Sequence, residues 1–65
     1  MPVIKVDLWK GRTEEQKAEI IKGITSVFEK QGVPKEHVTV IINDIDKSNW
    51  GMRGEQASKV MQDGK

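Results

Sequence analysis

The sequence predicts an α+β fold, a single βαβ subunit with parallel strands that is followed by a short C-terminal hairpin or tail. Apolar and polar residues alternate through residues 3–9 and again through residues 38–43, which is the period of a strand with one covered face. Between them, apolar residues recur at helical spacing over residues 14–31. This order predicts parallel strands joined by a right-handed crossover. A chain of 65 residues is expected to form one domain, residues 1–65.

The first strand is expected to run from Val3 to Trp9 and to end at Gly11-Arg12. One face of it is predicted to carry Ile4, Val6 and Leu8, and the other Val3, Lys5, Asp7 and Trp9.

The helix has clear signals at both of its ends. Thr13 is a good N-cap, and Gln16 at the third helical position completes a capping box. Gly32 is suited to a left-handed C-cap, and Pro34 cannot continue a helix. The predicted apolar face of the helix comprises Ile20, Ile21, Ile24, Val27 and Phe28.

The second strand is expected over Val38–Asn43, with the helix covering one face of the resulting sheet. The covered face would hold Ile4, Val6, Val38 and Val40, and the open face Val3, Lys5, Asp7, Trp9, Thr39, Ile41 and Asn43. No second long helix is predicted to cover the open face, so it must meet solvent or another subunit. Because the face is partly apolar and the chain is small, another subunit is favoured. In the tail, Met52-Arg53 is expected to form a short strand or turn, and Glu55–Met61 one or two helical turns.

Size and composition favour a homo-oligomer. Folds this small usually need disulfides, a metal ion or oligomerisation, and this chain has no cysteine and only one histidine. Its 11 basic and 10 acidic residues are mixed along the chain, which argues against a nucleic-acid partner. The apolar runs are too short to span a membrane or to form a signal peptide, so a cytoplasmic location is expected.

Pro2 is the first candidate for chemistry. Removal of Met1 would leave a secondary amine, and an unperturbed α-amino group titrates at about 7.7–8.0. An apolar pocket or a nearby arginine lowers that value, so the amine becomes a competent general base held in a rigid ring. The alternative is that Pro2 merely precedes an edge strand.

Two further candidates accompany Pro2. Arg12 presents a planar fork that can bind a carboxylate through two hydrogen bonds, although an exposed arginine in a turn is also ordinary. Trp50 and Trp9 suit either a pocket wall that excludes water around the amine or packing between subunits.

Together these residues resemble the 4-oxalocrotonate tautomerase family, through the Met-Pro start, GRTEEQK, VTVIINDI and NWGMRGEQASKV. The resemblance covers essentially the whole chain. It implies a hexamer, built as a trimer of dimers, and an isomerase that needs no cofactor and no metal. Its substrate would be a small carboxylate, an unsaturated 2-oxo acid such as 2-hydroxymuconate. Pro2 would move the proton, Arg12 would bind a carboxylate, and Trp50, a phenylalanine in the prototype, would keep the pocket apolar.

One position departs from the family pattern. The prototype carries a second substrate-binding arginine in the second strand, and Thr39 stands there in this chain. Arg53, where the prototype has glycine, is the candidate for the missing cation. Without a second cation, the resemblance would instead imply a monocarboxylate such as a phenylenolpyruvate-like acid.

Three alternatives remain open at this stage. A related hydratase, dehalogenase or decarboxylase would use the same proline, and hydration would need a carboxylate such as Asp7, Asp44 or Glu55 near it. A non-catalytic oligomeric module would retain Met1 and tolerate loss of Pro2. A small DNA-binding protein is the third alternative, and the balanced charge counts against it.

Overall fold

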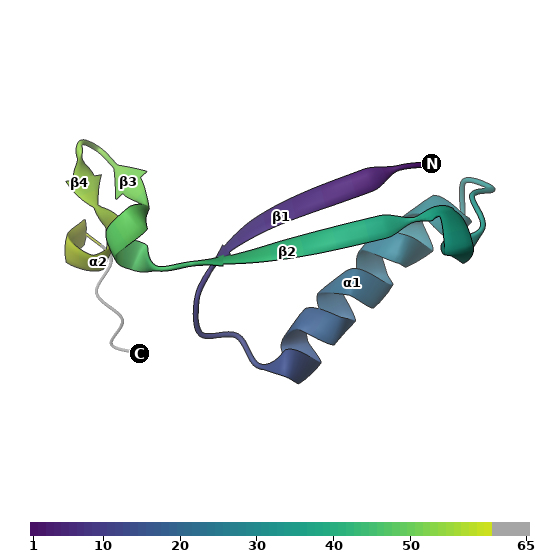
Figure 1. The fold of residues 1–65 in the computed structure, drawn as a ribbon, viewed down its shortest axis with the longest axis horizontal. Coiled ribbons are helices and arrows are strands. Elements are labelled where there is room, and N and C mark those ends of the chain that lie inside the picture. Colours follow the sequence, from purple (N-terminus) through teal and green to yellow (C-terminus); the bar gives the residue numbers. More distant parts are fainter. Residues whose placement is uncertain (61–65) are drawn as a thin grey trace.

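The computed structural model describes residues 1–60 and has the predicted β1–α1–β2 order, followed by a small C-terminal lobe (Figure 1). The two long strands are parallel and pair over their whole length, from Val3↔Thr39 to Trp9↔Ile45. The elements in chain order are β1 (Val3–Trp9), α1 (Glu14–Glu29), the 3₁₀ turn η1 (Lys35–His37), β2 (Thr39–Ile45), the 3₁₀ turn η2 (Lys47–Asn49), β3 (Gly51–Met52), β4 (Glu55–Gln56) and α2 (Ala57–Val60).

The first strand and both helix ends form as the sequence predicts, although α1 stops two residues earlier than expected, at Glu29 rather than residue 31. Gly32 adopts the left-handed conformation, with φ 92°. Its N–H donates to the carbonyl of Glu29 at 3.0 Å, and the N–H of Val33 donates to the carbonyl of Phe28 at 3.1 Å. These two hydrogen bonds are the Schellman motif, which satisfies the last carbonyls of the helix.

The second strand begins one residue later than predicted and ends two residues later. Val38 does not join the ladder, because its N–H donates to the carbonyl of Lys35 and closes η1. The strand continues past Asn43 because β1 still offers paired residues as far as Trp9. Register, which depends on the partner strand, therefore sets the length of β2.

The tail differs in detail from its prediction. Glu55 and Gln56 form β4, which pairs with β3 as an antiparallel hairpin, and the helical turn begins only at Ala57. Met61, which was expected to belong to that turn, lies outside the described residues.

The apolar face of α1 is narrower than predicted. Ile20, Ile24 and Phe28 are half-buried, whereas Ile21 is 39% exposed and Val27 is 54% exposed. The prediction that the last two belong to the covered face is therefore wrong within one chain. A helix that lies on a two-stranded sheet is covered over one stripe only, and Ile21 and Val27 flank that stripe on opposite sides.

The chain does not complete a hydrophobic core by itself. Among residues 1–60 only Ala57 is fully buried, so the predicted sheet residues Ile4, Val6, Val38 and Val40 are half-buried rather than enclosed. The radius of gyration is 14.8 Å, whereas a compact chain of this length has about 11 Å. The accessible surface is 5064 Å², against about 4,200 Å² for a compact monomer of this mass.

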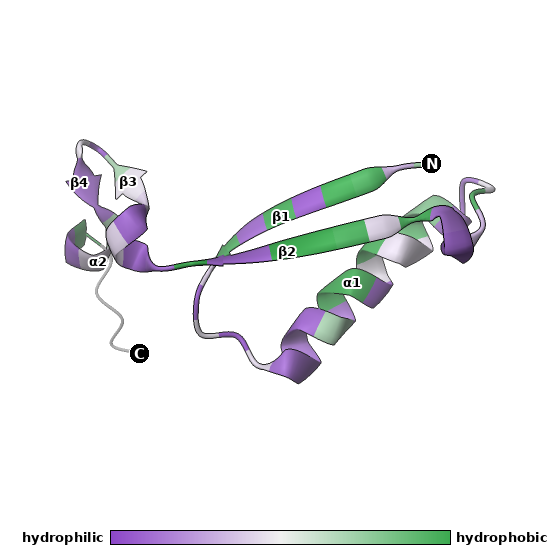
Figure 2. Cartoon of the chain, in the orientation of Figure 1, coloured by the Kyte–Doolittle hydropathy of each residue, from purple (hydrophilic) through white to green (hydrophobic). Residues whose placement is uncertain are grey.

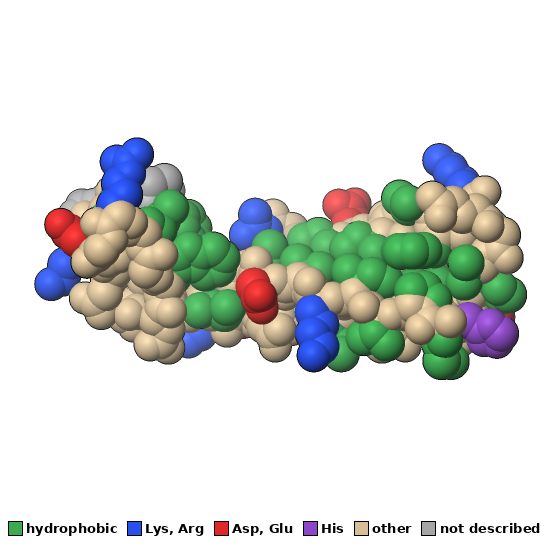
Figure 3. Space-filling model, turned by 90° about the horizontal axis from the view of Figure 1, so that it is seen from above, with side chains coloured by type: hydrophobic (Ala, Val, Ile, Leu, Met, Phe, Trp, Pro, Cys, Tyr) green, Lys and Arg blue, Asp and Glu red, His purple; other side chains and the backbone are tan. Residues whose placement is uncertain are grey.

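Much of the extra exposed surface is apolar. Figure 2 shows hydrophobic residues concentrated along β1, β2 and the adjoining part of α1, while the C-terminal lobe is mainly hydrophilic. In Figure 3 hydrophobic side chains form a continuous band along the elongated body of the molecule. On the open face of the sheet, Val3 is 55% exposed and Ile41 is 40% exposed. An exposed apolar band of this kind is typical of an interaction surface.

Candidate active site

Pro2 lies at the open end of the sheet, just before β1. Its carbonyl accepts a hydrogen bond from the N–H of Thr39 at 3.0 Å, which ties it to β2. The ring nitrogen takes no part in the ladder, because proline has no N–H to donate. Met1 is 87% exposed, so the Met1–Pro2 bond is accessible. Removal of Met1 would convert the ring nitrogen from an amide to an amine and leave the bond to Thr39 in place.

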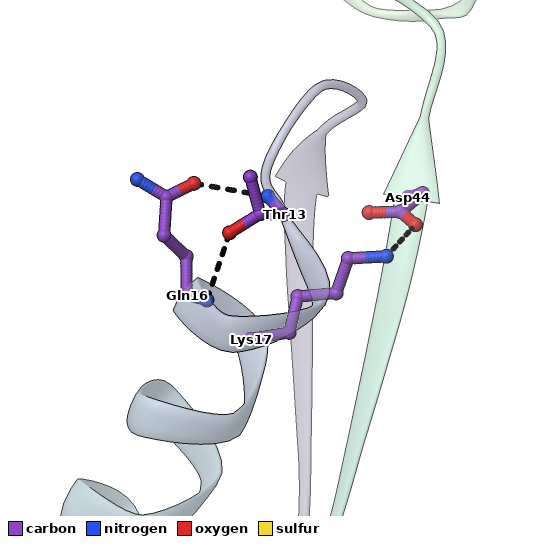
Figure 4. A network of polar contacts seen from close by, with 4 residues as sticks. All are labelled: Thr13, Gln16, Lys17 and Asp44. Carbon is purple, nitrogen blue, oxygen red and sulfur yellow. Dashed lines mark hydrogen bonds and ion pairs between the residues drawn. The ribbon is translucent and has the colours of Figure 1, made fainter.

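Arg12 lies in the turn between β1 and α1. Polar contacts at the start of α1 hold the helix end of this turn in place (Figure 4). The N–H of Thr13 donates to Oε1 of Gln16 at 3.0 Å, and the N–H of Gln16 donates to Oγ1 of Thr13 at 3.1 Å. This is the predicted capping box. The ammonium of Lys17 also binds the carboxylate of Asp44 and fastens the first turn of α1 to β2. Arg12 itself is exposed and has no hydrogen bond or ion pair within residues 1–60.

The capping box yields a stability prediction. Thr13→Ala is expected to lower the free energy of unfolding by about 1 kcal/mol, because the N–H of Gln16 loses its acceptor, the Thr13 hydroxyl. Urea denaturation followed by circular dichroism measures this. Thr13→Ser keeps the hydroxyl and serves as the matched control. Equal midpoints for the alanine variant and the wild type would show that the cap does not stabilise the fold.

The two tryptophans meet although they are far apart in the sequence. Trp9 at the end of β1 and Trp50 after η2 pack edge to face, with ring centroids 5.6 Å apart and an interplanar angle of 73°. The ammonium of Lys47 lies over the Trp9 ring, 4.8 Å from its centroid. Nε1 of Trp9 is buried and finds no acceptor within residues 1–60. This aromatic cluster, Trp9, Trp50 and Lys47, joins the C-terminal lobe to the end of the sheet.

Trp50 and Arg53 belong to one compact unit within the lobe. The N–H of Ala57 donates to the carbonyl of Trp50 at 2.7 Å, and Nε2 of Gln56 donates to the carbonyl of Ser48 at 2.9 Å. Arg53 occupies the turn between β3 and β4 with φ 55°, a left-handed conformation that costs a non-glycine residue about 1–2 kcal/mol.

Asp46 caps η2 at the base of the lobe. Its carboxylate accepts hydrogen bonds from the backbone N–H and the hydroxyl of Ser48, each at 3.0 Å. These bonds, the backbone bond first, hold the pKa of Asp46 below its usual value, and Lys10 at 3.9 Å acts in the same direction. The carboxylate therefore stays charged at neutral pH, and its capping contribution is lost only in acid, as the pH falls through that lowered pKa.

The predicted site residues do not converge within one chain. Pro2 and Thr39 lie at the N-terminal end of the sheet, whereas Arg12, Trp50 and Arg53 follow its other end (Figure 1). The seven residues of β1 separate the two groups by about 20 Å. A pocket that contains Pro2 and Arg12 together therefore needs two chains.

Several features of the site region could not be read from the sequence. No local sequence pattern predicted the contact of Lys47 with Trp9, because it depends on the path of the chain after β2.

A shallow depression of about 480 Å³ lies on α1, and Glu15 and Glu19 line it, which disfavours a carboxylate ligand. Within residues 1–60, His, Cys, Asp and Glu side chains nowhere gather in threes as a metal site, and no helix could cross a membrane.

Comparison with known proteins defines the class. A family model described as tautomerase enzyme matches residues 2–59. The chain is 38% identical over 61 residues to the 2-hydroxymuconate tautomerase of Comamonas testosteroni, covering 92% of this chain and 97% of that one. It therefore belongs to the tautomerase family, a family of isomerases.

Solved structures narrow the relationship. A 4-oxalocrotonate tautomerase isozyme from Methylibium petroleiphilum superimposes with a TM-score of 0.85 at 42% identity, covering 94% of this chain and 100% of the other. The DmpI protein of Helicobacter pylori gives 0.86 at 32% identity, with 95% and 98% covered. The chain is a homologue of 4-oxalocrotonate tautomerase, with the same βαβ fold.

Proposed function

We propose that this chain interconverts the enol and keto forms of an unsaturated 2-oxo acid and that Pro2 is the general base. The observation that carries the proposal is the position of Pro2. Its carbonyl is fixed by Thr39 at 3.0 Å, and its nitrogen is outside the ladder.

The reaction that we propose is a proton transfer without net change of atoms. The free amine of Pro2 accepts the proton of the 2-hydroxyl group, electrons move along the conjugated chain, and the ammonium returns the proton to carbon. No redox partner is needed for this isomerisation, and a base and its conjugate acid are sufficient.

Arg12 is the proposed anchor for a substrate carboxylate. It is exposed and unpaired within the described residues, and the capping box holds its turn. Arginine can bind a carboxylate through two parallel hydrogen bonds, which fixes orientation as well as position. Trp50, with Trp9 behind it, would form the apolar wall that keeps water from the amine.

An oligomer is part of this proposal, because Pro2 and Arg12 lie at opposite ends of β1. We propose that the pocket forms where the Pro2 end of one copy meets the Arg12 and Trp50 end of another. The open, partly apolar sheet face and the incomplete core support association of copies, and the family resemblance favours a hexamer.

The rival hydratase reading finds less support. Hydration would need a carboxylate beside Pro2 to position water. Asp7 instead accepts a hydrogen bond from Nδ2 of Asn43 at 3.0 Å, and Asp44 binds Lys17, so both carboxylates already have partners. Glu55 lies in the β3–β4 hairpin.

The Comamonas relative is a 2-hydroxymuconate tautomerase, and we propose a substrate of that kind for this chain.

A kinetic prediction tests the carboxylate anchor. Arg12→Ala is expected to lower kcat/KM for 2-hydroxymuconate by about 10- to 100-fold, mainly through KM, because a charge-assisted hydrogen-bond pair is lost. Steady-state kinetics measure this. Arg12→Lys keeps the charge without the fork and should fall in between. An unchanged KM in the alanine variant would contradict this role.

A further inference from the structure

The turn of the β3–β4 hairpin holds an arginine where the backbone disfavours one. Gly51 pairs with Gln56 and Met52 with Glu55, so Arg53 and Gly54 form a two-residue turn. Both have positive φ, 55° and 80°. Tight hairpins of this kind favour glycine or asparagine at the first turn position, because these residues adopt the left-handed conformation most easily. Local folding therefore gives no reason for arginine at position 53.

The charge of Arg53 has no partner within the described residues. Its side chain is exposed and makes no hydrogen bond or ion pair within residues 1–60. Asp44 and Asp46 form ion pairs with Lys17 and Lys10 instead. Arg53 and Arg12 are the only arginines of the sequence. Both are exposed, lie in segments that follow the same end of β1, and have no partner among residues 1–60. A strained residue with an unused charge points to a ligand outside the chain.

Arg53 and Trp50 are also held close to each other by the hairpin. Arg53 follows Trp50 by three residues, so their Cα atoms lie within about 11 Å of each other. The bond from Ala57 to the carbonyl of Trp50 closes the hairpin against the tryptophan. The backbone of Arg53 is therefore held within about 11 Å of any pocket wall that Trp50 forms.

We propose that Arg53 binds the second carboxylate of a dicarboxylate substrate in the pocket that Trp50 helps to form. The inference rests on the function proposed above. Arg12 supplies one cation, and Thr39 beside Pro2 is neutral. The ammonium of Lys47 is engaged over the Trp9 ring, so we assign the second cation to Arg53. Arg53 is then the residue that makes the enzyme prefer dicarboxylates to monocarboxylates.

Substitutions that preserve the turn test this separately from folding. Arg53→Gly and Arg53→Asn remove the charge and suit the left-handed backbone, so their thermal midpoints should equal or exceed that of the wild type. Their kcat/KM for 2-hydroxymuconate is expected to fall about 10- to 100-fold, and that for phenylenolpyruvate by less than about 3-fold. Arg53→Lys should retain part of the preference. Lys22→Ala removes one exposed charge from α1 and is the control for net charge.

A binding measurement makes the result independent of turnover. Muconate, an unsaturated dicarboxylate that cannot tautomerise in this way, is titrated while the fluorescence of Trp9 and Trp50 is followed. Arg53→Gly should raise its Kd by about 10- to 100-fold. An equal loss for both enols, or an unchanged Kd for muconate, would overturn the inference.

Failure of the proposed function looks different. If the wild type binds muconate through Arg53 but turns over no enol in a Pro2-dependent manner, the proposed function fails and the carboxylate site stands. If turnover depends on Pro2 but not on Arg53, only the present inference fails.

Discussion

Pro2→Ala is expected to lower kcat/KM for enol ketonisation by about 10²- to 10⁴-fold, the usual contribution of a positioned general base. Alanine after Met1 still permits removal of the methionine, so the variant would have a free primary amine. It would lack the ring that holds the nitrogen in one direction at the end of the sheet. The expected fall in kcat/KM therefore comes from poorer positioning and altered basicity of the amine, because both processed proteins have a free terminal amine.

Intact mass spectrometry must accompany this assay. Molecules that retain Met1 have an amide at the Pro2 nitrogen and should be inactive. Activity should also fall as the pH drops below the pKa of the amine, because a protonated amine has no lone pair to accept the proton. Equal turnover by the processed wild type and the processed Pro2→Ala variant would remove Pro2 from the mechanism.

Ile41→Asp is expected to dissociate the oligomer and to abolish activity with it. Ile41 is 40% exposed on the open face of the sheet, where it pairs with Lys5 across the ladder. If a second copy covers this face, the carboxylate must be desolvated, which costs several kcal/mol per ion, and the neighbouring Lys5 offsets only part of that cost. Because the proposed pocket takes Pro2 and Arg12 from different copies, the separated chains would lack a complete pocket.

Sedimentation velocity and activity at the same protein concentration measure this effect. Ile41→Val removes one methylene, which costs about 0.5–1.5 kcal/mol in a packed site, and should leave both assembly and turnover largely intact. An Ile41→Asp enzyme that keeps the wild-type sedimentation coefficient would show that this face stays in water.

The elements of the fold were predictable because their signals are local. The capping box of Thr13 and Gln16 and the left-handed Gly32 act within a few residues of the chain, and all three are found in the structure. Strand β1 matches its predicted bounds for the same reason, since alternation is a property of consecutive residues. The end of β2 was not predictable, because β2 continues as far as it can pair with β1, and that pairing ends at Trp9.

The candidate site was predictable only as a set of residue types. Pro2, Arg12, Trp50, Thr39 and Arg53 were chosen from motifs and from a family resemblance, and their roles stay proposals. The contact of Trp9 with Trp50, and the place of Lys47 over it, depend on how the chain runs between β2 and the hairpin. No local pattern encodes that path.

The sequence by itself determined the βαβ order and the helix caps, because these follow from short-range backbone chemistry. It also predicted a partner subunit from the size of the chain, and that stays a prediction. Only the tertiary structure decided that Pro2 and Arg12 lie at opposite ends of one strand and that Arg53 bears a left-handed backbone. Strand pairing and hairpin closure fix these positions across the chain. Pro2 therefore has neither Arg12 nor Trp50 beside it in its own subunit, and we expect a second copy to complete the site.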